Sequence, residues 1–218
     1  RPWVLMKELG ISFEEELVPF GGNERYRTFT QFSPTGRVPC LADGTRVIWD
    51  SLAITEYLAE REPRVWPRDA DARAWARSAA AEMHSGFQAL RERCGMNCGV
   101  RVRLDGLGPA VEADLRRIDE LWRQGLSRSG GPFLCGPAFT AADAFFAPVA
   151  FRVQTYGLPL SPDAAAYAAR LLALPSMRAW YAAALAEPWR DPTHEEDVRR
   201  AGTLIEDLRA PAADGVRS

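Results

Sequence analysis

The sequence lacks the features that mark membrane, nucleic-acid-binding and disulfide-stabilised proteins. Its 218 residues contain no apolar run near the roughly 18 residues that a membrane-spanning helix needs, and no signal peptide is recognisable. A formal net charge of −2, from 27 basic and 29 acidic residues, gives no reason to expect nucleic acid or a membrane surface as partner. The four cysteines match no metal or redox spacing, so we expect no metal site and a reducing cytoplasm.

The most informative segment that is present runs from Ser33 to Ser51, SPTGRVPCLADGTRVIWDS. Val38-Pro39 stands where a strand is expected to begin, and a proline there cannot donate a ladder hydrogen bond. We expect a cis bond at Pro39, which would leave the main-chain N–H and C=O of Val38 free to hold an extended peptide. An edge-strand proline without a ligand is the alternative.

An acid and a hydroxyl follow at Asp50-Ser51, directly before the helical pattern LAITEYLAE. The free N–H groups of a helix start favour a carboxylate, while the Asp50 side chain suits an ammonium group. Together they fit the head group of an amino acid better than a phosphate. Aspartate and serine are also favoured helix caps, so a purely structural role is the alternative, and the two roles can coexist.

The first 62 residues mix helix and strand signals and indicate a small α/β domain. The turn residues Asp43-Gly44 between two apolar runs predict a β-hairpin. We expect helices at 2–9 and 51–61, a strand at 12–19, a short helix or ordered loop at 23–31, and paired strands at 37–41 and 45–49.

Residues 63–69 contain two prolines and predict a linker, after which residues 70–218 form a second domain. Alanine becomes abundant there and no strand is expected. Thr140 and Asp143 resemble a capping box and are assigned a structural role. We expect helices at 70–94, 109–128, 140–156, 163–173 and 175–187, with a weaker helical stretch at 193–210.

The order of four short motifs resembles the cytosolic glutathione S-transferases over nearly the whole chain. They are S-P-x-G-x-V-P-x-L, D-S-x-A-I-x-x-Y-L, a W-P linker and F-T-A-A-D. Among bacterial members, the chain looks nearest to serine-type enzymes related to the zeta class. The resemblance implies a thioredoxin-like N-terminal domain, an all-helical C-terminal domain, a homodimer and glutathione as co-substrate. It also implies attack of the glutathione thiolate on a small electrophile.

The resemblance also implies roles for individual residues of the first domain. The Val38 main chain, next to cis-Pro39, would pair with the cysteinyl unit of glutathione. Asp50 and Ser51 would hold its γ-glutamyl end, and Arg37 lies where family members often carry Lys or Gln near the glycine carboxylate.

The family's catalytic hydroxyl precedes the first helix, so we expect it, and the first strand, upstream of Arg1. Arg1 would stabilise the thiolate or contact the second substrate. The apolar candidates for the electrophile pocket are Met83, Phe87, Cys94 and Met96, whereas neither histidine is expected to act as a base. Two alternatives stay open, a glutathione-dependent cis-trans isomerase of the maleylacetoacetate isomerase type and a non-catalytic binding or stress protein.

Overall fold

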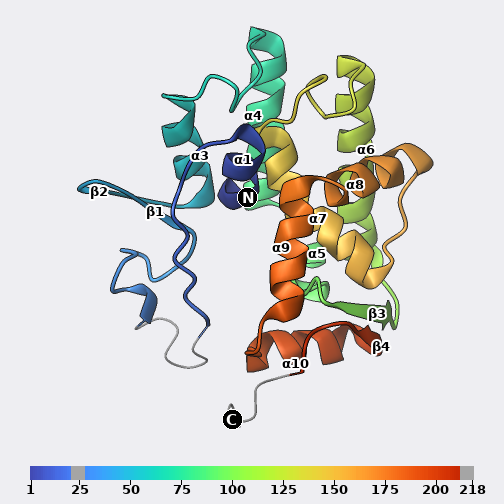
Figure 1. Ribbon diagram of the computed structural model, residues 1–218. Helices are drawn as coiled ribbons and strands as arrows, with labels where there is room; N and C mark the ends of the chain where they lie inside the picture. The colour runs from blue at the N-terminus through green and yellow to red at the C-terminus, as the bar shows by residue number, and fades with distance from the viewer. Residues whose placement is uncertain (21–27, 212–218) are drawn as a thin grey trace.

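A computed structural model describes residues 1–20 and 28–211 of the chain (Figure 1). The N-terminal part begins with helix α1 (Pro2–Leu9). A hairpin of β1 (Cys40–Asp43) and β2 (Arg46–Trp49) follows, with Gly44 at φ 61° in the turn. Helix α3 (Ser51–Ala59) completes this part, so both predicted helices and the predicted hairpin are confirmed.

The C-terminal part is mainly helical, and its helices form the right-hand body of Figure 1. They are α4 (Ala70–Ser85), α5 (Gln88–Arg93), α6 (Pro109–Ser129), α7 (Ala141–Tyr156), α8 (Pro162–Leu172), α9 (Pro175–Ala186) and α10 (Pro192–Ala201). None of the described helices is long and apolar enough to cross a membrane.

Helix α7 forms the centre of the core and is buried on nearly all sides. Its Phe146 ring packs edge-on against Trp122 of α6, which in turn meets Tyr167 of α8. Helix α1 packs against α7 and α9, so the N-terminal part shares this apolar core with the helical part. The predicted capping box of Thr140 and Asp143 is present at the start of α7.

The strand predicted at 12–19 is wrong, because residues 11–20 adopt no regular structure. A strand needs a neighbour to satisfy its main-chain hydrogen bonds. Here a cavity of about 820 Å³ lies between residues 11–16 and strand β1. Within the described part of the chain, this segment therefore has no strand partner. The predicted element at 23–31 lies partly outside the described residues, and Thr28 and Phe29 are helical.

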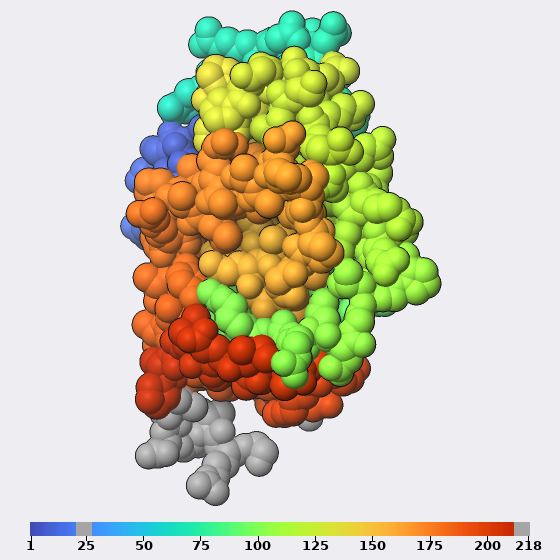
Figure 2. Space-filling model, turned by 90° about the vertical axis from the view of Figure 1, so that its right-hand side faces the viewer, coloured from blue at the N-terminus to red at the C-terminus, as the bar shows by residue number. Residues whose placement is uncertain are grey.

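The expectation that no strand follows residue 69 is also wrong. Strand β3 (Val100–Leu104) pairs antiparallel with β4 (Gly202–Asp207), so the stretch predicted as helix at 193–210 is α10 followed by a strand. Figure 2 shows β4, in red, lying along the green β3 segment at the base of the helical part. The alternation Val100, Val102, Leu104 was the sequence signal for β3.

The single helix predicted at 70–94 is interrupted between α4 and α5. Gly86, in an extended conformation, is the C-cap of α4, and Phe87, in a left-handed conformation with φ 58°, is the N-cap of α5. The break has a functional consequence, because it turns α5 and the following loop toward the groove described next.

Candidate functional site

The residues predicted to hold a ligand line one groove of about 670 Å³ in the structure. Its walls come from the start of α1, the loop before β1, the start of α3, the end of α4, α5 and α7. The predicted residues in its lining are Arg1, Arg37, Val38, Pro39, Asp50 and Ser51. Two sequence motifs separated by a hairpin are therefore brought to a common concave surface.

The loop before β1 presents free main-chain groups to this groove. The Val38–Pro39 bond is cis, as expected, and Val38 is 45% exposed. No described residue forms a hydrogen bond with the main-chain N–H or C=O of Val38. These groups are available to an extended ligand.

Asp50 and Ser51 combine a structural role with polar atoms that line the groove. Asp50 is the N-cap of α3, and its Oδ1 accepts a hydrogen bond of 2.7 Å from the Leu52 N–H. The Ser51 Oγ lies at the groove wall and accepts from the Arg1 guanidinium at 3.4 Å. One carboxylate oxygen of Asp50 is thus committed to the helix, while the other faces the end of α4.

His84 belongs to this site, although its isolation in the sequence gave no reason to single it out. Its Nδ1 lies 3.3 Å from the Arg1 guanidinium and its Nε2 lies 3.3 Å from Asp50 Oδ2. Because arginine only donates, Nδ1 must accept, so a neutral imidazole carrying its hydrogen on Nε2 satisfies both contacts. His84 thereby connects the start of α1 to the start of α3.

Two further arginines that the sequence did not single out, Arg91 and Arg152, also line the groove. Arg152 donates to the Cys94 carbonyl at 2.8 Å, and Arg91 donates to the His84 carbonyl at 3.1 Å. Burial, together with the charge of Arg91, lowers the pKa of Arg152 to about 10.

The pKa of Arg1 is lowered for the same reasons. Burial and the charges of Arg91 and Arg152 lower the pKa of Arg1 to about 10, while Asp50 opposes the shift. These groups still carry their charge at neutral pH. Together with Arg37, four arginines line the groove, and Asp50 supplies the carboxylate in the same lining. The groove is therefore strongly positive and suited to anions.

Comparison with known proteins assigns this architecture. Residues 1–61 match the family model for the glutathione S-transferase N-terminal domain, and residues 73–183 match that for the C-terminal domain. The chain belongs to the glutathione S-transferase family. This match confirms the predicted family, the predicted fold class and the prediction that the chain is a glutathione transferase.

Individual relatives agree with this assignment. Glutathione S-transferase 1 of Dianthus caryophyllus is 31% identical over 161 residues, 70% of this chain and 71% of that protein. Maleylacetoacetate isomerase of Rattus norvegicus is 27% identical over 159 residues, covering 70% and 72%. A crystal structure of a Burkholderia glutathione transferase homologue with bound glutathione aligns with a TM-score of 0.61 and 26% identity, covering 84% of this chain and 88% of that one.

The apolar residues predicted to form the electrophile pocket of this transferase separate into two groups. Met96 lines the groove, and its assignment to the electrophile pocket stays a prediction. Met83, Phe87 and Cys94 are buried in the hydrophobic core, so their assignment to the pocket is wrong. Among the described residues, no three His, Cys, Asp or Glu side chains are placed to hold a metal ion.

Proposed function

We propose that this glutathione transferase binds glutathione in the groove and directs its thiolate to a small electrophilic substrate. The observation that carries the proposal is that the free main chain of Val38 and the Asp50–Ser51 helix start line the same groove. The Burkholderia homologue was crystallised with bound glutathione, which supports the same ligand here.

Each part of glutathione has a chemically suitable partner in the groove. Asp50 suits the γ-glutamyl ammonium, and Ser51 with the N-terminus of α3 suits the neighbouring carboxylate. The Val38 main chain, beside Pro39, would hold the cysteinyl unit as a strand-like contact. Arg37 would bind the glycine carboxylate.

Glutathione supplies a thiol, and its ionised form is the nucleophile. A free thiol with a pKa of about 8.5 is ionised to only a few per cent at pH 7. We propose that the charged guanidinium of Arg1, together with the N-terminus of α1, stabilises the thiolate.

Calorimetric titration tests this proposal by comparing glutathione with cysteinylglycine, which lacks the γ-glutamyl unit. Each charged hydrogen bond lost with that unit contributes about 1.5–3 kcal/mol, so we expect cysteinylglycine to bind at least ~100-fold more weakly. No heat of binding at millimolar glutathione, or equal affinity for both peptides, would refute the peptide site.

A glutathione-dependent cis-trans isomerisation is the second candidate. Maleylacetoacetate, the substrate named for the rat relative, is an organic acid. Arg91 and Arg152 have no carboxylate partner among the described residues, so they are placed to hold such an anion beside glutathione. Turnover of maleylacetoacetate, compared with conjugation of a neutral chlorinated aromatic, separates the two reactions.

A non-catalytic binding protein of the same fold would bind glutathione and perform neither reaction. We further propose a homodimer located in the cytoplasm, as the family resemblance implies. The four cysteines support a reducing compartment, since each is a free thiol in the structure.

A further inference from the structure

A second cavity, of about 340 Å³, lies between the loop that follows α5 and the segment joining α9 to α10. Met96 lines both this cavity and the groove, so the two hollows adjoin across one side chain. The cavity lining contains three acids, Glu187, Asp191 and Glu195, whereas the groove lining contains Asp50. Three aromatic residues, Phe20, Trp180 and Trp189, also line the cavity.

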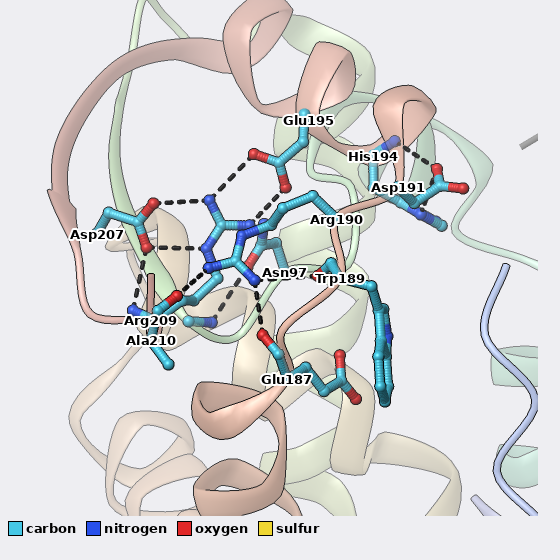
Figure 3. Close-up of polar contacts among 11 residues, drawn as sticks. Asn97, Glu187, Trp189, Arg190, Asp191, His194, Glu195, Asp207, Arg209 and Ala210 are labelled. Carbon is cyan, nitrogen blue, oxygen red and sulfur yellow. Dashed lines mark hydrogen bonds and ion pairs between the residues drawn. The ribbon is translucent and has the colours of Figure 1, made fainter. Parts of the chain in front are cut away.

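Most charged groups around this cavity already have a partner (Figure 3). Arg209 forms ion pairs with Glu195 and Asp207, and His194 lies 3.0 Å from Asp191. Arg190 donates hydrogen bonds to the main-chain carbonyls of Glu187, Trp189 and Ala210. These contacts hold the C-terminal segment together, and the Leu208 N–H donates to the Gly99 carbonyl at 2.9 Å, which joins that segment to the loop.

The carboxylate of Glu187 is the exception among the acids that line the cavity. It forms no hydrogen bond and no ion pair with any described residue, and in Figure 3 it lies beside the Trp189 indole. Partial burial raises the pKa of Glu187, while the charge of Arg190 opposes this shift. The Arg190 guanidinium donates to three main-chain carbonyls and not to this carboxylate, so a half-buried acid is left without a hydrogen-bond partner and favours a ligand cation beside it.

Aromatic faces attract cations through the negative potential of their π-systems, and a nearby carboxylate adds to that attraction. We propose that this cavity is a binding site for a small organic cation that carries an aromatic ring, held between Trp180 and Trp189 with its ammonium group at Glu187. The site is separate from the glutathione groove, where four arginines face Asp50, whereas in this cavity Arg209 is neutralised by Glu195 and Asp207.

Calorimetry with two probes of matched size tests the proposal. The probes are 2-phenylethylamine, which is protonated at pH 7, and 2-phenylethanol, which is neutral. We expect the wild-type chain to bind the amine at least tenfold more tightly than the alcohol. Glu187→Gln, which keeps the side-chain shape, is expected to abolish that preference. Glu60→Gln, which removes an exposed acid outside the cavity, is expected to preserve it.

Two further results separate this site from the groove and from a folding defect. Saturating glutathione is expected to leave the amine affinity unchanged, and Trp189→Leu to weaken both probes. Equal binding of the two probes, a preference that survives Glu187→Gln, or displacement of the amine by glutathione would overturn the proposal. Failure of glutathione itself to bind would refute the groove assignment and leave this test intact.

Discussion

Replacing Asp143 by alanine is expected to lower the free energy of unfolding by about 3–5 kcal/mol. The Asp143 side chain is fully buried and accepts four hydrogen bonds. Its donors are the main-chain N–H groups of Leu134 and Thr140, the Thr140 hydroxyl and the Tyr167 hydroxyl, at 2.8–3.1 Å. Alanine would leave these buried donors without an acceptor.

The effect is expected to be large because Asp143 joins three elements of the core. It caps α7, fixes the loop at Leu134 and anchors Tyr167 of α8. Denaturant unfolding followed by fluorescence measures the change. Asp163→Ala, at the exposed first turn of α8, is the matched control and is expected to cost less than about 1 kcal/mol. A loss below 1 kcal/mol for Asp143→Ala would show that the network is not a main source of stability.

Asp50→Asn is expected to weaken glutathione binding by about 10- to 100-fold, measured by calorimetry. Asparagine retains the oxygen that accepts from the Leu52 N–H, and it tolerates the positive φ of 72° at this position. The substitution therefore removes the charge offered to the ligand ammonium while preserving the helix cap.

Asp69→Asn is the matched control for this variant. Asp69 caps α4 by accepting a 2.8 Å hydrogen bond from the Ala72 N–H, but it does not line the groove. We expect its glutathione affinity to equal that of the wild-type chain. An equal loss in both variants would mean that the change acts through folding, and no loss in Asp50→Asn would remove Asp50 from the binding site.

The parts of the site that could be predicted from sequence depend on local chemistry. A proline before an apolar pair marked the loop at Pro39, and an acid-serine pair marked the start of α3. The Asp43-Gly44 turn fixes their separation, since β1 and β2 pair directly between them. Short-range rules were therefore sufficient to bring the two motifs to one face.

The remaining parts depend on contacts between distant segments. His84, Arg91 and Arg152 reach the groove through the break after α4 and the packing of α7, which no local pattern encodes. Strands β3 and β4 pair across about a hundred residues, so β4 looked like the end of a weak helix. The strand predicted at 12–19 was wrong for the opposite reason, because local strand propensity without a partner strand does not make a strand.

The central claim is that the Val38 main chain and the Asp50–Ser51 helix start hold one peptide between them. Amide hydrogen exchange of Val38, measured with and without saturating glutathione, tests it most directly. Because this N–H has no partner among the described residues, we predict rapid exchange in the free protein and at least ~10-fold slower exchange in the complex. Unchanged exchange at Val38 in a sample shown by calorimetry to be saturated with glutathione would contradict the account.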